Sequence, residues 1–410
     1  MKRHTLVSAF RFSLSCRAVA WRRRVAFLPL LLSGCFSPSH EPPRPGSTDL
    51  GGREIVLPAQ ILDSTLIVEA KWDHFGPYHF LIDTGSSVTL VTPELAARYA
   101  ENGVPLPETP RVEVQSSDGT ITVLPAVLLR RIELGRARFN HVPALIYDCL
   151  PLTGQLGVKI DGVLGFPLFR AAELTLDYPH GRVLLRPPGF AGPPPAGSSL
   201  SFNNASKTPL VSLRIGDRSF IALVDSGSDE TLSLNPFGLA PKFAFGPAEG
   251  PTVGTLTGDR TEQVGRLAET IYVGDYAVPR PTVEITDDLS AIGGGILRYF
   301  TITFDQAHDR VTFYRDATDP IAVPGRRSAG LSFRKTPAYW RVVGVVPGSP
   351  ADGAEVEPGD LVTRINGEPV AKWDVARFER LMANAESITY TFLYGPHEAD
   401  KKLKVVDLVP

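Results

Sequence analysis

The 410-residue sequence has only three cysteines and eight histidines, and no apolar run reaches the roughly 20 residues that a membrane-spanning helix needs. The histidines form no paired spacing typical of metal ligands, so we expect no metal and no other cofactor. The net charge of −2 conceals an imbalance, because residues 1–34 contain seven Lys or Arg and no acidic residue. The remaining chain is acidic, which argues against nucleic acid as a partner.

Glycine and proline are abundant, at 37 residues each, while 43% of the chain is hydrophobic and 21% is charged. This composition is that of a globular protein with frequent turns and few long helices. Short runs rich in Val, Ile, Leu, Phe and Thr, separated by Gly, Pro and Asp, indicate short strands. The fold class that we predict is therefore mainly β.

The first segment has the features of an export signal. Basic residues 22–24 precede the short apolar run 25–32, which ends in Leu32-Ser33-Gly34-Cys35. This ending resembles the bacterial lipobox, which implies cleavage before Cys35 and a lipid anchor on that residue; simple secretion is the alternative. Ser37 is not the Asp that retains such lipoproteins at the inner membrane. The resemblance thus implies a cell-envelope lipoprotein, in the outer membrane and facing the periplasm or the cell surface.

Cysteine chemistry is correspondingly limited. Cys16 leaves with residues 1–34 and Cys35 would be acylated, so Cys149 remains alone and no intrachain disulfide is expected. Because Cys149 lies in an apolar context, we interpret it as a buried structural thiol, with a nucleophile as the alternative.

Proline-rich joints divide the chain into blocks. The tether at 35–49 and the linker at 188–199 are both rich in Pro, and another boundary lies near 318–327. The predicted domains are 50–187, 200–316 and 322–408.

The first two domains share a repeated motif. Leu81-Ile82-Asp83-Thr84-Gly85-Ser86 recurs as Leu223-Val224-Asp225-Ser226-Gly227-Ser228, and a later element, Leu164-Gly165, recurs as Ile292-Gly293. Two landmarks in the same order predict a duplicated β domain.

A carboxylate at the end of an apolar strand requires hydrogen-bond donors, and the turns after Asp83 and Asp225 supply backbone N–H groups and hydroxyls. If the two domains pack about a pseudo-twofold axis, these carboxylates face each other and share one proton. One can then act as a general base toward water while the protonated one polarises a carbonyl.

These motifs, with Val163-Leu164-Gly165 and Ala291-Ile292-Gly293, resemble those of the aspartic proteases of the pepsin and retropepsin clan over roughly residues 50–316. The resemblance implies two retropepsin-like β-barrel lobes that form a pepsin-like bilobal unit, with Asp83 and Asp225 as the catalytic pair. It also implies that Thr84 and Ser226 brace the opposing loops and that Ser86 and Ser228 bond the outer carboxylate oxygens. The supporting loops comprise Thr84, Gly85, Ser86, Ser226, Gly227 and Ser228.

In that clan a β-hairpin flap follows each motif. Candidate flap tips contain Ser117, Asp118, Gly119, Thr257 and Gly258, although ordinary surface hairpins are the alternative. Neither candidate holds the tyrosine of pepsin. Asp229 and Glu230 are a second departure, since the first copy of the motif has no acidic residue at these positions. If their side chains point inward they raise the pKa values of the catalytic pair, and if they point outward they face solvent.

The third block differs from the first two. Ser349-Pro350-Ala351 predicts a helix start, Asn366-Gly367 a tight hairpin turn, and Asp374 the cap of a helix. The run from Val345 through Gly367 resembles a PDZ domain of bacterial exported proteases, a small β-barrel with two helices. The resemblance implies that a peptide, including a C-terminal one, adds as a strand beside Gly330, Leu331, Ser332 and Phe333. A spacer or interaction cap is the alternative.

The sequence therefore predicts a membrane-anchored aspartic endopeptidase whose PDZ domain recruits or positions peptide or protein substrates. The competing hypothesis is a catalytically inactive, peptide-binding scaffold in which the two Asp only brace the lobe interface. Because both Asp-(Thr/Ser)-Gly-Ser turns are intact, we favour the enzyme. Since the third block supplies no residue of the pair, we expect short-peptide cleavage to survive removal of residues 320–410.

Overall fold

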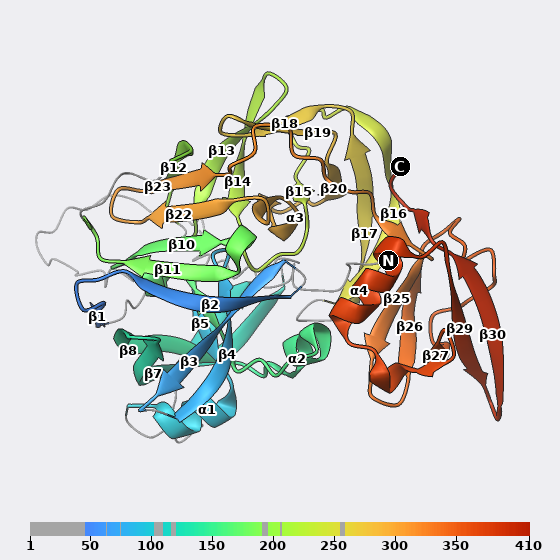
Figure 1. Cartoon of the computed structure of the whole chain (residues 1–410), viewed down its shortest axis with the longest axis horizontal. Coiled ribbons are helices and arrows are strands. Elements are labelled where there is room, and N and C mark those ends of the chain that lie inside the picture. The colour runs from blue at the N-terminus through green and yellow to red at the C-terminus, as the bar shows by residue number, and fades with distance from the viewer. Residues whose placement is uncertain are drawn as a thin grey trace, which may run out of the picture.

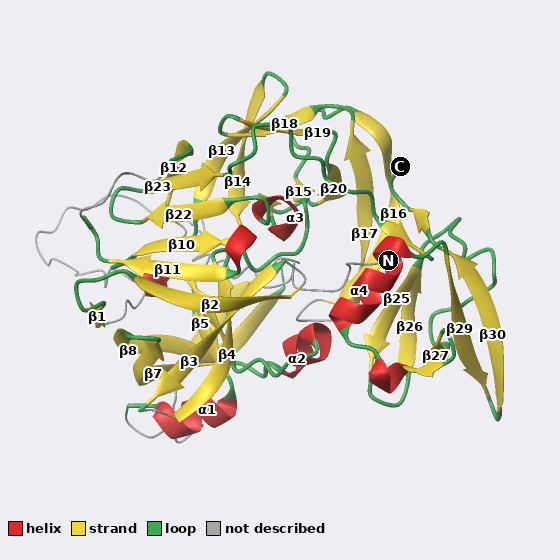
Figure 2. Cartoon of the chain, viewed as in Figure 1, coloured by secondary structure: helices red, strands yellow, loops and turns green. Residues whose placement is uncertain are grey.

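The computed structural model describes residues 46–62, 64–73, 75–101, 110–115, 120–190, 196–205, 207–254 and 259–410. Strands dominate these residues (Figure 2), and they form two lobes that share one continuous sheet network. A third β domain lies to the right of both lobes in Figure 1. The predicted mainly β class is confirmed.

Lobe 1 contains eleven strands and two short α-helices within the described residues. They are β1 (Ser47–Asp49), β2 (Ile55–Leu62), β3 (Thr65–Trp72), β4 (Phe75–Asp83), β5 (Thr89–Val91), α1 (Pro93–Tyr99), β6 (Arg111–Gln115), β7 (Ile121–Leu134), β8 (Ala137–Ile146), α2 (Leu150–Leu156), β9 (Gly162–Gly165), β10 (Glu173–Asp177) and β11 (Arg182–Arg186), with 3₁₀ turns η2 (Phe166–Phe169) and η3 (Tyr178–His180). The Thr92 side chain caps α1 by accepting from the N–H of Leu95, and Pro93 stands at the first turn of the helix.

Lobe 2 repeats this plan in fewer residues. Its elements are β12 (Ser198–Asn203), β13 (Leu210–Ile215), β14 (Arg218–Val224), β15 (Leu232–Leu234), β16 (Phe243–Gly254), β17 (Asp259–Leu267), β18 (Thr270–Val273), β19 (Tyr276–Pro279), β20 (Thr282–Ile285), β21 (Ser290–Ile292), α3 (Gly294–Leu297), β22 (Thr301–Asp305) and β23 (Arg310–Tyr314). Where lobe 1 inserts α1 and α2, the described part of lobe 2 has only turns and short links. This difference explains why the second copy of the repeat is shorter.

The duplication is visible in the strand pairing. β4 pairs in parallel with β9, and β14 pairs in parallel with β21. In each lobe, the strand before the Asp-containing turn therefore lies beside the strand of the later repeated element, Leu164-Gly165 or Ile292-Gly293. A short strand then pairs antiparallel with the same partner in each lobe, β5 with β9 and β15 with β21. These equivalent pairings place Asp83 and Asp225 at corresponding positions.

A shared six-stranded sheet joins the lobes. Its order is β2, β11, β10, β22, β23 and β12, and all five contacts are antiparallel. Its centre lies where Thr175 of β10 faces Thr303 of β22, and their hydroxyls are 3.0 Å apart. Because these two residues are equivalent in the repeat, the contact marks the pseudo-twofold relation between the lobes.

One hydrophobic core extends through both lobes and includes Phe166, Phe202 and Phe304, whose rings pack edge to face across the lobe boundary. A smaller core in lobe 1 surrounds Cys149, which is fully buried. Burial raises the pKa of this thiol to about 12, which fits an inert, structural cysteine.

The C-terminal domain has its own core. Its elements are β24 (Arg327–Ser328), β25 (Leu331–Lys335), β26 (Trp340–Val345), β27 (Leu361–Ile365), β28 (Glu368–Pro369), the 3₁₀ turn η4 (Val370–Lys372), α4 (Val375–Asn384), β29 (Ser387–Tyr394), β30 (His397–Lys404) and β31 (Val406–Asp407). The core is aromatic, because Phe333, Trp340, Phe378 and Tyr390 pack together in it.

The local sequence signals in this domain predicted a hairpin turn and a helix cap correctly and one helix wrongly. Asn366 and Gly367 both have positive φ, as a tight hairpin turn requires, and the Asp374 side chain caps α4 by accepting from the N–H of Arg377. Ser349 also accepts a hydrogen bond from the N–H of Asp352, but the chain makes only turns there, so the helix predicted after Ser349 is wrong.

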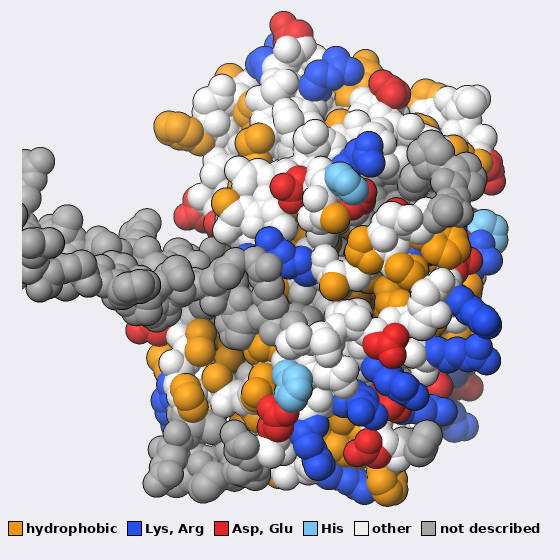
Figure 3. Space-filling model, turned by 90° about the vertical axis from the view of Figure 1, so that its left-hand side faces the viewer, with side chains coloured by type: hydrophobic (Ala, Val, Ile, Leu, Met, Phe, Trp, Pro, Cys, Tyr) orange, Lys and Arg blue, Asp and Glu red, His pale blue; other side chains and the backbone are white. Residues whose placement is uncertain are grey.

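The C-terminal domain contacts lobe 2 and approaches lobe 1 on the side away from the shared sheet (Figure 1). On lobe 2, the N–H of Thr252 in β16 donates to Ser332 Oγ in β25 at 3.2 Å. On lobe 1, a Cβ placed on Gly157 after α2 would lie 3.9 Å from Val375 Cγ2 of α4. Figure 3 shows the opposite side, where Lys and Arg side chains gather at lower right with acidic groups among them.

Candidate active site

Asp83 ends strand β4 and is completely buried. Its Oδ1 accepts hydrogen bonds from the backbone N–H groups of Gly85 at 2.8 Å and Ser86 at 3.0 Å. The turn after the strand therefore solvates one carboxylate oxygen with backbone donors, as the apolar strand end requires.

Asp225 follows strand β14 and is 2% exposed. Its Oδ1 accepts from the N–H of Gly227 at 3.0 Å, and its own N–H donates to the carbonyl of Ile292 at 3.0 Å. The second turn thus repeats the geometry of the first.

Each turn is braced by the other lobe through a reciprocal network. The Thr84 hydroxyl donates to the carbonyl of Val224 and accepts from the N–H of Ser226, while the Ser226 hydroxyl donates to the carbonyl of Ile82 and accepts from the N–H of Thr84. The four distances are 2.6, 3.0, 2.9 and 3.0 Å in that order. The structure thus brings together Thr84 and Ser226 in the bracing position implied by the resemblance.

The glycines of the two turns bring the carboxyl groups into one site. A Cβ added to Gly85 would lie 2.5 Å from Cγ of Asp225, and one added to Gly227 would lie 2.4 Å from Cγ of Asp83. Each carboxyl group therefore packs against the glycine of the opposite turn, where no larger residue fits. The crossed arrangement makes Asp83 and Asp225 neighbours across the lobe boundary.

The environment of Asp83 disfavours its charge. Burial, followed by the charge of Asp225, raises the pKa of Asp83 well above its ordinary value, although the backbone donors of Gly85 and Ser86 act in the opposite direction. A side-chain hydrogen bond with Asp225 acts in the same direction as burial and raises the pKa of Asp83 further. A pair in this situation holds one proton between its two carboxyl groups.

The serine hydroxyls of the turns have other partners than the resemblance implied. Ser86 Oγ donates to the carbonyl of Val88 at 2.7 Å, and Ser228 Oγ accepts from the N–H of Glu230 at 3.3 Å. Their hydroxyls shape the ends of the turns, and the carboxylate of Asp83 receives the backbone N–H of Ser86 instead.

Asp229 and Glu230 take neither of the two orientations considered from the sequence. Both are nearly buried, at 9% and 4% exposure, and neither contributes to the pKa shift of Asp83. They turn away from the pair, Glu230 toward Arg326 and Asp229 toward a cavity beside α4.

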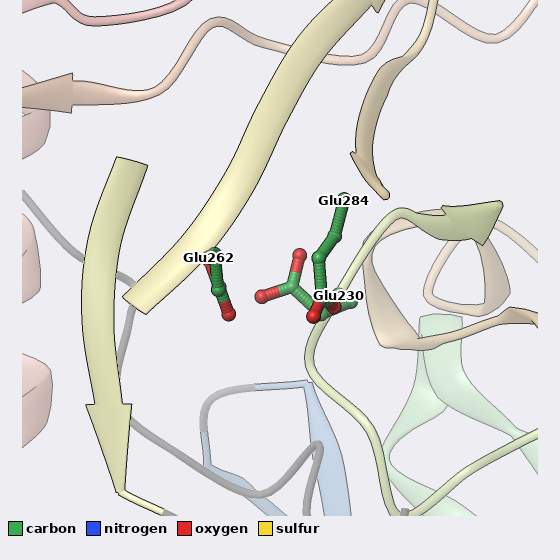
Figure 4. Close-up of side chains that lie close together, drawn as sticks. All are labelled: Glu230, Glu262 and Glu284. Atoms are coloured by element: carbon green, nitrogen blue, oxygen red, sulfur yellow. The ribbon is translucent and has the colours of Figure 1, made fainter. Parts of the chain in front are cut away.

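Glu230 belongs to a buried carboxylate triad with Glu262 of β17 and Glu284 of β20 (Figure 4). One oxygen from each lies within 4.8 Å of the others, a spacing that suits a metal ion. Two arginines already supply the positive charge, however: Arg326 pairs with Glu230 and Glu262, and Arg260 pairs with Glu284. The triad is therefore neutralised largely from within the chain.

Arg326 and its partners were not among the predicted site residues. The three glutamates come from separate segments and the arginine from the joint before β24, so no local motif connects them. The only sequence signal was the Asp-Glu pair directly after the second Asp motif.

The predicted flap residues Ser117, Asp118, Gly119, Thr257 and Gly258 lie outside the described residues, as does Cys35. The strands on either side are described: β6 pairs with β7 and β16 pairs with β17, both antiparallel. These two antiparallel pairs flank the predicted flap positions. Within the described residues no helix is long and apolar enough to cross a membrane.

The predicted peptide-binding segment of the C-terminal domain is placed at β25. Gly330 precedes the strand with a φ of +92°, and its carbonyl accepts from the N–H of Val346. Leu331, Ser332 and Phe333 are buried, and β25 pairs only with β26 among the described strands. Its other edge thus carries no described strand.

Comparison with known proteins agrees with this organisation. Residues 68–168 match the family model for aspartyl proteases, and residues 341–392 match the model for a PDZ domain. No curated protein matches the chain. The chain therefore contains an aspartyl protease domain and a C-terminal PDZ domain.

Among solved structures, one match is entitled "Crystal Structure of the HtrA3 PDZ Domain Bound to a Phage-Derived Ligand (FGRWV)". It is 16% identical, with a TM-score of 0.18, and the match covers 20% of this chain and 86% of that one.

Proposed function

We propose that the chain is an aspartic endopeptidase that hydrolyses peptide bonds through Asp83, Asp225 and an activated water. The observation that carries this proposal is the crossed packing of each carboxyl group on the glycine of the opposite turn. The raised pKa of Asp83 supports it, because the reaction needs one protonated and one ionised carboxyl.

In the proposed reaction, the ionised carboxylate removes a proton from water as the water oxygen attacks the peptide carbonyl. The protonated carboxyl hydrogen-bonds to the carbonyl oxygen and stabilises the charge that develops there. The tetrahedral species then collapses, the C–N bond breaks, and a carboxyl group transfers a proton to the departing amine. The bracing hydroxyls of Thr84 and Ser226 keep the two turns in register during these steps.

We further propose that the PDZ domain recruits or positions peptide or protein substrates, and that a lipid on Cys35 anchors the exported chain at the bacterial cell envelope. The family match to a PDZ domain supports the first part. The lipobox-like segment before Cys35 and the export signal support the second.

The test of catalysis is cleavage of a peptide library by the purified chain, with Asp83→Asn, Asp225→Asn and the double variant alongside. Because the pair acts as a unit, each single variant should lose about as much as the double variant, by roughly 10³-fold or more. Asp217→Asn is the matched control, since that side chain in lobe 2 is 98% exposed. Its activity should equal that of the wild type.

The plot of cleavage rate against pH should be bell-shaped, because titration of the carboxyl pair limits the rate on both the acidic and the basic side. Because the pKa of Asp83 is raised, the essential proton is retained at pH values where an ordinary aspartate is ionised, and activity falls as pH rises through the raised value. Full activity in both single variants would show that the lobes do not work as an aspartic protease, and absence of cleavage by the wild type would favour the inactive scaffold. Loss in Asp83→Asn alone would point to a dimer of first lobes.

A further inference from the structure

A cavity of about 170 Å³ lies between lobe 2 and the PDZ domain. Its walls come from the residues directly after the second active-site turn, from the joint before β24 and from the C-terminal half of α4. Its acidic residues are Asp229 and Glu230 of lobe 2 and Glu379 of α4, and its apolar wall includes Val323, Met382 and Ala383.

Asp229 has an unusual environment for a carboxyl group. It is 9% exposed, and neither Oδ1 nor Oδ2 accepts a hydrogen bond from any other described residue. Oε1 of Glu379, which also lines the cavity, is likewise buried without a hydrogen-bond partner among the described residues. A buried carboxylate without donors is costly, so these oxygens indicate a site for a ligand that supplies donors.

The arginines that line the cavity are engaged elsewhere. Arg326 pairs with Glu230 and Glu262, and the guanidinium of Arg327 donates to the carbonyls of Met382 and Ala385 at the end of α4. The positive charge of Arg326 is therefore already balanced by the glutamates of the triad. Burial and the charge of Glu230 raise the pKa of Asp229, and the charge of Arg326 lowers it only in part. A further cation in the cavity would stabilise the ionised form of Asp229.

We propose that this cavity is a subsite for a basic side chain, Lys or Arg, of the peptide substrate, with Asp229 and Glu379 as its carboxylate partners. This inference rests on the proposed function. Asp229 lies four residues after Asp225, so the two Cα atoms are at most about 14 Å apart, a distance that a peptide of a few residues spans. A cavity of about 150 Å³ admits benzene, so this one has room for a long basic side chain. The apolar wall suits its methylene stem.

The subsite combines two domains. Asp229 comes from the protease lobe and Glu379 from the PDZ helix, so the preference for a basic residue depends on the PDZ domain being in place.

The experiment measures kcat/KM for matched peptides that carry Lys, Arg, Gln or norleucine at each position around the cleaved bond. The full chain should prefer Lys or Arg over the neutral residues at one position by at least tenfold. Asp229→Asn should reduce that ratio at least tenfold, and Glu379→Gln should reduce it by a smaller factor. Asp217→Asn, which removes an exposed carboxylate from the same lobe, should leave the ratio unchanged.

A second measurement separates failure of the subsite from failure of the proposed function. Binding of the Lys and norleucine peptides to the Asp83→Asn chain is measured by calorimetry, with and without Asp229→Asn. Tighter binding of the Lys peptide that depends on Asp229 supports the subsite even if the wild type cleaves nothing. Equal binding of both peptides, or a Lys preference that survives Asp229→Asn, overturns it.

Discussion

Replacing Arg326 with Met tests whether the joint between lobe 2 and the PDZ domain stabilises the second active-site turn. The Arg326 side chain is 12% exposed and pairs with Glu230 and Glu262, whose side chains are 3% and 0% exposed. Removing one partner of a buried ion pair costs about 3–5 kcal/mol of unfolding free energy, because the other charge stays buried. For a unit of this size that corresponds to a drop in Tm of roughly 10 °C.

The loss should depend on pH. Burial already raises the pKa of Glu230 in the intact protein, and Arg326 opposes that shift. Without the guanidinium the folded-state pKa rises further. A carboxyl with a raised folded-state pKa destabilises the fold as pH rises above its unfolded value of about 4.3, so the deficit should be largest near pH 7 and smallest near pH 4.

The assay is thermal denaturation of Arg326→Met across this pH range, beside Arg327→Met as the matched control. Arg327 is the next residue, but within the described chain its guanidinium donates to the carbonyls of Met382 and Ala385 and pairs with no carboxylate, so its variant should show a smaller loss without this pH trend. Adding Glu230→Gln to Arg326→Met should recover part of the stability. A Tm for Arg326→Met that equals the wild type at pH 7 would refute the reasoning.

Three further predictions follow from the described contacts and the sequence. Gly85→Ala and Gly227→Ala each place a Cβ within about 2.5 Å of the carboxyl carbon from the opposite turn, so both variants should lose peptide cleavage. Gly154→Ala is the control, because its added Cβ meets no neighbouring atom within 4 Å, and this variant should cleave normally. Cys35→Ser should release the chain from the membrane fraction or leave it unprocessed, and unchanged membrane retention on cell fractionation would contradict the lipid anchor. A chain ending at residue 327 should still cleave short peptides, while one ending at 319 should lose that activity along with Arg326; equal activity of the two would contradict the role of the joint.

Much of the fold could be predicted because the information was local or repeated. The strand-turn motif around Asp83 recurs around Asp225, and a repeat of this kind predicts equivalent strands in equivalent pairings. The Asn366-Gly367 turn and the Asp374 cap were predictable for the same reason, since each depends on its own residues and immediate neighbours. The helix predicted after Ser349 failed although its cap hydrogen bond formed. A cap does not propagate a helix where tertiary contacts hold the following residues in turns.

The electrostatics of the site could not be predicted in this way. Where Asp229 and Glu230 point is decided by groups distant in sequence, namely Arg326, Glu262, Glu284 and Glu379. A carboxylate beside an active-site motif has only two simple orientations, toward the pair or toward solvent. The structure provides a third, a space lined by lobe 2, by the joint before β24 and by α4 of the PDZ domain.

Residues 318–327, the joint between lobe 2 and the PDZ domain, are less independent of lobe 2 than the sequence indicates. Residues 318–327 were interpreted as a boundary, and removal of residues 320–410 was expected to spare short-peptide cleavage. In the structure the joint packs on lobe 2: Ile321 is buried with its N–H bonded to the carbonyl of Ala277, and Arg326 pairs with two buried glutamates. One of these, Glu230, has its N–H bonded to Ser228 in the second active-site turn. These contacts form a short path from the PDZ domain through the joint and Glu230 to the turn that carries Asp225, and the truncations at 319 and 327 test whether this path matters for the proposed activity.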